Sequence, residues 1–178
     1  MLYVRDDQIN MILPGDAYIA PLYNRAINVS SINGLSASFR TFFLVAAPGI
    51  YTLDASGYGQ GAIVNEDGTI NSPANPAARG SIISVYGTGG GVTTPTFPDG
   101  SIVPKAANLV NGGYLTVGLR IGQMLYQGAA PTLLNGATVT IVRIPPDVTP
   151  GPAVAVRKGV FYGGGTIFSQ PGVTVSVK

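Results

Sequence analysis

Eight carboxylic acids are the residues of this sequence best suited to acid–base chemistry: Asp6, Asp7, Asp16, Asp54, Glu66, Asp67, Asp99 and Asp147. A glycoside hydrolase needs two such groups facing each other across a cleft. Most of these acids stand beside Gly, Pro or another turn residue, where an aspartate accepts hydrogen bonds from nearby backbone. We therefore expect them to support turns rather than to catalyse a reaction.

Nucleophilic catalysis has none of its usual partners here. The sequence contains no His and no Cys, so serine and threonine hydroxyls have no imidazole base and there is no thiolate. The Ser-x-x-Lys pattern of another nucleophile class is also missing. We expect no catalytic residue and no enzyme activity.

The same absences remove the usual ligands of zinc, copper and haem. Calcium prefers oxygen ligands, which the Asp6–Asp7 pair and the Asn65–Asp67 turn both offer without the full spacing of a calcium loop. The Gly-rich stretches 57–61 and 87–91 have no lysine and lead into no helix, as phosphate-binding loops require. We predict no metal and no cofactor, with calcium left as an open alternative.

Two kinds of binding residue remain. The basic residues number ten, and their densest group is the pair Arg157–Lys158, whereas nucleic-acid binding needs a basic stripe. We expect no nucleic-acid partner. Tyrosines can stack on sugar rings, but there is no Trp and Tyr in β-proteins mostly packs; the tyrosines considered are Tyr51, Tyr58, Tyr86, Tyr114, Tyr126 and Tyr162.

Any such residue must be positioned by strands. Gly (25) and Pro (14) interrupt the 178 residues every few positions, and the runs between them alternate β-branched or aromatic residues with polar ones. This pattern is typical of a β-sandwich. Asn33-Gly34 and Asp67-Gly68 mark hairpin turns. We predict an all-β fold with strands in 26–31, 36–45, 81–86, 115–121, 137–144 and 172–177.

No stretch approaches the roughly 18 apolar residues that cross a bilayer; the longest is Phe42–Ala47. We expect no membrane insertion. The strand-like alternation that starts at Met1 does not resemble a signal peptide, so we expect that one has been removed or that the numbering begins inside a longer precursor.

An internal repeat divides the chain. Residues 1–4 (MLYV) are echoed by 124–127 (MLYQ), and each copy continues as strand, Pro-containing turn, strand, Gly turn and strand. The first copy has nothing that corresponds to Ser81–Tyr86 and Leu115–Ile121, which precede the second. A first sandwich built this way lacks its opening strands and exposes a core groove and unpaired edges.

Three explanations fit the missing strands of that first sandwich. A strand from another subunit can fill the gap, as in donor-strand polymers. Alternatively, residues 48–80 fold back onto it, or the sequence is a fragment. Only 10% of the residues are charged, against about a quarter in ordinary soluble domains, and this favours a surface covered by neighbouring subunits.

From Leu44 onward the sequence resembles a known but uncharacterised family. The residues that carry the resemblance are 47–53 (APGIYTL), 59–65 (GQGAIVN), 71–76 (NSPANP), 78–89 (ARGSIISVYGTG), 125–131 (LYQGAAP) and 169–177 (SQPGVTVSV). They are similar to a C-terminal domain of large secreted acidobacterial (Solibacter-type) proteins. Residues 2–10 (LYVRDDQIN) match the segment further upstream in that family, whereas 114–123 and 159–166 depart from its pattern.

The resemblance implies tandem immunoglobulin-like sandwiches, the second similar to the IPT/TIG modules shared by plexins and transcription factors. It also implies export to the cell surface or beyond, and it brings no catalytic residue. We therefore expect a partial sandwich in 1–47, a connecting hairpin and Pro-rich segment in 48–80, and a full sandwich in 81–178.

The function we expect is that of an extracellular structural protein that self-assembles, as a filament or surface layer, through strand pairing between subunits. The partner is then a second copy of the chain, and the candidate contact residues are Met1, Tyr3, Ile9, Ile12, Phe39, Phe42 and Phe43. The alternative is an adhesin-like or carbohydrate-binding module of a larger secreted protein, with surface glycans or other cell-surface proteins as partners.

Overall fold

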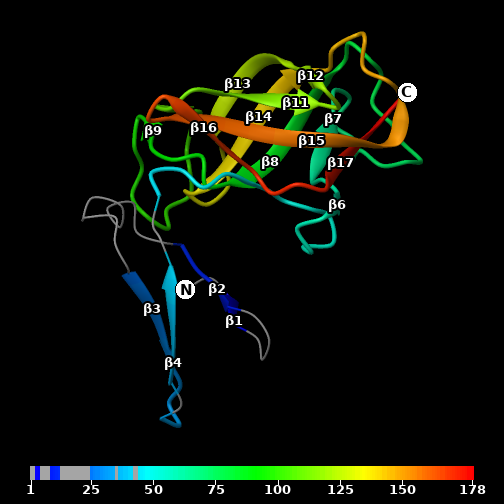
Figure 1. Cartoon of the computed structure of the whole chain (residues 1–178). Helices are drawn as coiled ribbons and strands as arrows, with labels where there is room; N and C mark the ends of the chain where they lie inside the picture. The colour runs from blue at the N-terminus through cyan, green and yellow to red at the C-terminus, as the bar shows by residue number, and fades with distance from the viewer. Residues whose placement is uncertain (1–2, 5–8, 13–24, 35, 42–43) are drawn as a thin grey trace. The chain divides into compact units, whose positions relative to one another are not determined.

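The computed structural model of the chain describes residues 3–4, 9–12, 25–34, 36–41 and 44–178. It divides into two compact units, unit 1 (residues 1–45) and unit 2 (residues 46–178). Every regular element in the described ranges is a β-strand, which confirms the predicted all-β class (Figure 1).

Unit 1 contains two antiparallel strand pairs. β1 (Tyr3–Val4) pairs with β2 (Ile9–Asn10), and β3 (Arg25–Ser30) pairs with β4 (Ser36–Thr41). At the tip of the second pair, the Gly34 N–H donates to the Ser31 carbonyl at 3.1 Å, and Gly34 has a φ of +81°. Asn33-Gly34 therefore forms the turn that the sequence predicts, because glycine adopts this φ without a steric penalty.

Unit 2 contains a seven-stranded antiparallel sheet with the order β5-β8-β14-β13-β10-β9, in which β7 also pairs with β8. Its centre is the pairing of β8 with β14, seven residues each. The strands are β5 (Gly49–Ile50), β7 (Ile63–Asn65), β8 (Ile82–Thr88), β9 (Thr93–Thr94), β10 (Asn108–Leu109), β13 (Gln123–Ala129) and β14 (Ala137–Arg143).

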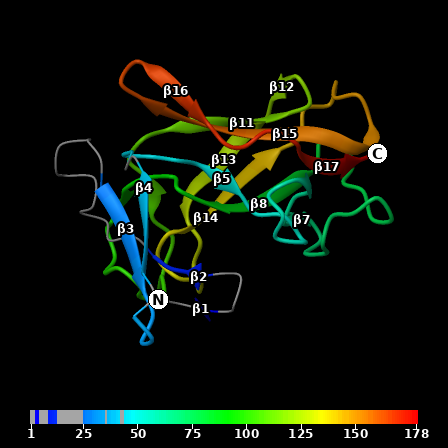
Figure 2. The same ribbon diagram turned by 60° about the horizontal axis from the view of Figure 1, so that its bottom comes forward.

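A six-stranded sheet covers the first one, with the order β12-β11-β15-β17-β6 and with β16 beside β15 (Figure 2). All of its pairings are antiparallel except that of β17 with β6. The strands are β6 (Gly59–Gln60), β11 (Gly113–Val117), β12 (Arg120–Ile121), β15 (Gly151–Tyr162), β16 (Gly165–Phe168) and β17 (Val173–Val177). The two sheets are consistent with a β-sandwich.

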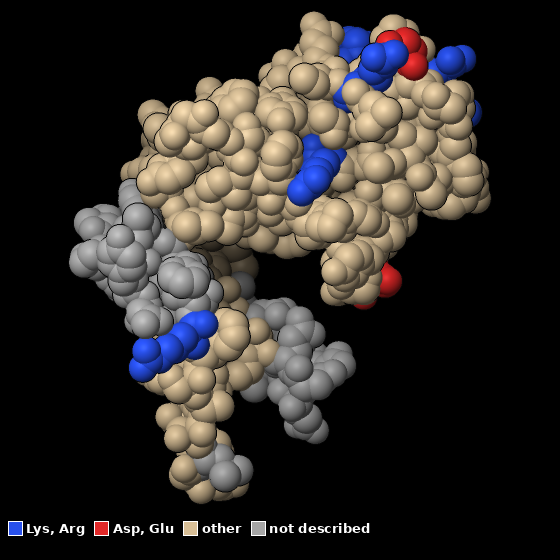
Figure 3. Space-filling view, in the orientation of Figure 1, with Lys and Arg blue, Asp and Glu red and all other residues tan. Residues whose placement is uncertain are grey.

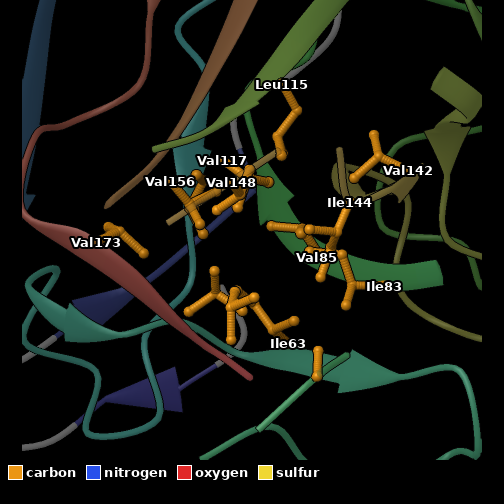
Figure 4. Packing of buried hydrophobic residues seen from close by; sticks show 14 residues of the cluster. Ile63, Ile83, Val85, Leu115, Val117, Val142, Ile144, Val148, Val156 and Val173 are labelled. Atoms are coloured by element: carbon orange, nitrogen blue, oxygen red, sulfur yellow. The ribbon is translucent and has the colours of Figure 1, made fainter. Parts of the chain in front are cut away.

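The core of unit 2 lies between these sheets. Along β8 every second side chain is buried, so that Ile83 and Val85 lie in one apolar cluster with Leu115 and Val117 of β11 (Figure 4). Each such side chain contributes about 1.5–3 kcal/mol when it leaves water. The rest of the cluster is Ile50, Ile63, Ala77, Val142, Ile144, Val148, Val156, Val173, Val175 and Val177.

The segment 48–80, expected from the sequence as a connection, contributes three strands to this sandwich. β5 and β7 both pair with β8, and β6 pairs with β17. These pairings join residues far apart in the sequence, and in the structure 48–80 belongs to the same compact unit as the residues that follow.

A second difference from expectation concerns Leu115–Ile121, predicted as one strand. In the structure Gly118 has a φ of +62°, and the chain reverses there between β11 and β12, with Thr116 opposite Ile121. The run is therefore a hairpin, because a positive φ breaks an extended strand.

Candidate contact surfaces

The structure describes four of the seven predicted contact residues. Met1, Phe42 and Phe43 lie outside the described residues. Of the others, Tyr3 is in β1, Ile9 in β2 and Phe39 in β4, whereas Ile12 follows β2 and is partly buried. The side chains of Ile9 and Phe39 are exposed.

The internal repeat of the sequence has a counterpart in strand pairing. In unit 2, β13 pairs with β14 and β15 with β17, all antiparallel, as β1 pairs with β2 and β3 with β4 in unit 1. The register matches as well. Tyr3 stands opposite Asn10, four residues before Pro14, and Tyr126 stands opposite Ile141, four residues before Pro145. Unit 1 thus repeats part of the pairing scheme of unit 2.

This correspondence identifies the face of the β3–β4 hairpin that matches a core face. Matching 26–29 (AINV) with 153–156 (AVAV) places Ile27 at the position of Val154. Phe39 stands opposite Ile27, and Val175 stands opposite Val154. Phe39 is 65% exposed, whereas Val175 is fully buried. A position that lies in the core of unit 2 therefore carries an exposed aromatic ring in unit 1.

The outer edges of the two pairs also differ between the units. In unit 2, β14 pairs additionally with β8, and β15 additionally with β11. Among the described residues of unit 1, no third strand pairs with β2 or β3. Unpaired backbone groups along such edges can accept a further strand. We use the term open face for the surface formed by two features: the unpaired edges of β2 and β3, and the side chains of Ile27, Val29 and Phe39.

Unit 2 carries an aromatic cluster on the outer face of its six-stranded sheet, made of Tyr114, Phe161 and Phe168. The Tyr114 ring lies 5.8 Å from Phe161 and 6.1 Å from Phe168 between centroids. The Arg157 guanidinium stacks 4.6 Å from the centre of the Phe168 ring, a cation–π contact. The surface over β15 is otherwise almost free of charge (Figure 3).

Among the tyrosines considered for sugar stacking, Tyr114 belongs to this cluster. Tyr126 instead has a structural role, since its hydroxyl accepts from the Ala107 N–H at 3.0 Å and lies 2.8 Å from the Ala129 carbonyl. Phe161 and Phe168 were not singled out from the sequence. Their alternation with Val160 and Ile167 is the signal that marks them as outward residues of β15 and β16.

Two of the acids have the predicted role in turns. Asp54 accepts hydrogen bonds from the backbone N–H and the hydroxyl of Ser56, and Asp67 does the same from Thr69. The pKa of Asp54 is lowered mainly by the Ser56 N–H, and the pKa of Asp67 mainly by the Thr69 hydroxyl. Both carboxylates are thus engaged within their own turns.

No family model, curated protein or solved structure matches this chain. The resemblance inferred from residues 44–177 therefore stays a prediction. Within the described residues, no helix is long and apolar enough to cross a membrane.

Proposed function

We propose that this protein is a non-catalytic structural protein of the cell surface or extracellular space that assembles with copies of itself. In this proposal both units are immunoglobulin-like sandwiches in tandem, and the first lacks its opening strands. A strand from a neighbouring copy completes it by donor-strand complementation. The extracellular location rests on the family resemblance.

The exposure of Phe39, at the position of the buried Val175, is the observation that carries the proposal. Val29, at the position of the buried Val156, is exposed as well. Covering large apolar side chains stabilises by about 1.5–3 kcal/mol each. A partner strand over the open face gains this energy at several positions at once.

The isolated hairpin supports the same conclusion. A two-stranded hairpin is at best marginally stable in water, and independent stability needs a third strand or a packed face. Among the described residues, β3 and β4 pair only with each other. A strand added to the edge of β3, where β11 lies against β15 in unit 2, meets this need.

The scarcity of charge also favours association. Lys, Arg, Asp and Glu make up 10% of the residues. With so few surface charges, electrostatic repulsion between copies of the protein is weak, and association is favoured. A contact between the open face of one copy and a different surface of the next does not close on itself, so it builds a filament or a layer.

Light scattering with negative-stain microscopy of the purified chain tests the proposal, using Phe39→Asp as the disrupting variant. Wild type should form regular assemblies, and Phe39→Asp should remain monomeric because a charge cannot be buried in the new contact. Ile32→Asp is the matched control, since Ile32 is fully exposed in the turn of the same hairpin. A monomeric wild type, or assembly by Phe39→Asp, would contradict the proposal.

The aromatic cluster favours a second candidate, a module that binds neutral surface glycans as part of a larger secreted protein. Exposed rings beside a single cation offer sugars stacking and one charged donor. Binding to an array of neutral glycans, abolished by Phe168→Ala and retained by Phe39→Asp, would favour this candidate over self-assembly.

A further inference from the structure

A polar layer lies inside unit 2, between the two sheets. It consists of Lys158 of β15, Thr138 and Thr140 of β14, and Gln127 of β13, and each is more than nine-tenths buried. A buried lysine is rare unless it is paired. The layer therefore calls for a physical reason.

Strand register brings these four side chains together. Gln127 stands directly opposite Thr140, and Thr138 lies two residues away on the same face of β14. From the other sheet, the Lys158 ammonium donates to the Thr138 hydroxyl at 3.2 Å. The Gln127 amide extends across to the six-stranded sheet, which contains Lys158. A Cβ atom added to Gly113 of β11, in that sheet, would lie 3.0 Å from Gln127 Nε2.

The hydrogen-bonding groups of the layer are unequally satisfied. Lys158 has three N–H donors, and Thr138 accepts one of them. Gln127 Nε2 and Thr140 Oγ1 are buried and have no hydrogen-bond partner in the described structure. The Lys158 ammonium, the Gln127 amide nitrogen and the Thr140 hydroxyl can all donate hydrogen bonds. A single bound species that satisfies all three must therefore be a hydrogen-bond acceptor.

The positive charge of Lys158 favours an anion over a neutral hydrogen-bond acceptor. Burial lowers its pKa to about 8, and no opposing charge contributes, so at neutral pH the ammonium is mostly protonated. A water molecule accepts hydrogen bonds but leaves the positive charge of Lys158 uncompensated. An anion both accepts the hydrogen bonds and neutralises that charge. Protein interiors are close-packed, which restricts the ligand to a small ion.

We infer that Lys158, Gln127 and Thr140 bind a small monovalent anion of the size of chloride between the sheets of unit 2. The inference is independent of self-assembly, because it rests on side chains within the core of a single unit. Its consequence is that the ion stabilises the folded sandwich by binding it in preference to the unfolded chain.

Urea unfolding of the full chain at pH 7 tests the site, with sodium gluconate exchanged for sodium chloride at constant ionic strength. The unfolding equilibrium constant of wild type should fall as chloride rises, about tenfold once chloride exceeds its Kd tenfold. Lys158→Met, which places an apolar side chain of similar length in the core, should lose this response. Lys105→Met, at an exposed lysine, should retain it.

Equal stability of wild type in chloride and in gluconate would overturn the site, and so would a full chloride response in Lys158→Met. Thr140→Val provides a second check that preserves the lysine, and its response should be weaker than that of wild type. A peptide map that recovers Lys158 joined to Gln127 by an amide bond, with loss of one ammonia, would equally exclude the anion.

Discussion

The side chain of Gln170 pairs with the backbone of Ile50 as a neighbouring strand would. Its Oε1 accepts from the Ile50 N–H at 3.0 Å, and its Nε2 donates to the Ile50 carbonyl at 2.5 Å. Ile50 belongs to β5 at the edge of the seven-stranded sheet and is buried. One side chain thus satisfies two backbone groups on an edge that would otherwise be left unpaired.

Replacing Gln170 should therefore destabilise unit 2. We expect Gln170→Ala to lower the free energy of unfolding by about 1–3 kcal/mol, because a buried N–H and carbonyl lose their partners. Gln123→Ala, at an exposed position of β13, should change it by less than about 0.5 kcal/mol. Urea titrations followed by circular dichroism measure both values, and equal effects would contradict the role assigned to Gln170.

Asn71 should be still more sensitive. It is fully buried, and its amide donates to the Ser176 carbonyl and to Asn65 Oδ1 while accepting from the Ser176 N–H and from Gln60 Nε2. We expect Asn71→Ala to cost about 2–4 kcal/mol of unfolding free energy.

An isosteric change at Asn71 separates hydrogen bonding from packing. Asn71→Asp should destabilise more than Asn71→Ala, since a carboxylate would face two acceptor oxygens. Asn108→Asp, at an exposed position of β10, is the matched control and should have little effect. If Asn71→Asp unfolded like wild type, the assigned network would be wrong.

The buried Lys158 predicts a rise in stability at alkaline pH. Its pKa is about 8 in the folded protein and near 10.5 when exposed, so between these values the unfolded chain binds more protons. The unfolding free energy should therefore increase from pH 8 to pH 10.5, by up to about 3 kcal/mol. Below pH 8 both states are protonated and the penalty of burial is constant. Lys158→Met should remove this rise, measured in gluconate buffer.

Val175 and Phe39 hold corresponding positions and should respond to truncation in different assays. Val175→Ala should lower the unfolding free energy of unit 2 by about 2 kcal/mol, through lost burial and a cavity. Phe39→Ala should leave that transition unchanged and weaken self-association by about tenfold or more, as expected of an aromatic contact residue. Circular dichroism and light scattering separate the two effects, and a stability loss in Phe39→Ala would indicate that its ring packs within the subunit.

Two glycines with positive φ should differ in their tolerance of alanine. Gly89 has a φ of +67°, and a Cβ there would clash with the Ala47 carbonyl oxygen. Gly164 has a φ of +81° with no heavy atom within 4 Å of such a Cβ. Gly164→Ala should cost about 1–2 kcal/mol for conformation alone, and Gly89→Ala more than twice as much. Similar losses in both would show that backbone contact at Gly89 adds nothing.

The all-β class could be predicted because local alternation carries it. The alternation in Ser81–Tyr86 predicts a strand with one apolar face. In β8 this face carries Ile83 and Val85, which are buried in the core. The pairing of β5 and β7 with β8 could not be predicted, since it joins residues separated along the chain and no local pattern records it. The turn at Gly118 was missed because Leu115–Ile121 alternates like a continuous strand on both sides of the glycine.

Some features of the candidate surfaces could likewise be predicted from the sequence, and others could not. Phe39 could be proposed from the repeat alone, and its exposure agrees with a contact role. The aromatic cluster could not be foreseen, because it forms only when β11, β15 and β16 lie side by side. Likewise, nothing in the sequence near Lys158 reveals that Thr138 of the opposite sheet accepts its hydrogen bond.

The last strand of the sandwich is held along both edges. β17 pairs antiparallel with β15 on one side and, on the other, parallel with β6 and with Ala77. Tension applied along β17 therefore loads backbone hydrogen bonds from two neighbours simultaneously, in shear, and they must rupture together rather than unzip one after another. A fold built this way resists mechanical extraction of β17.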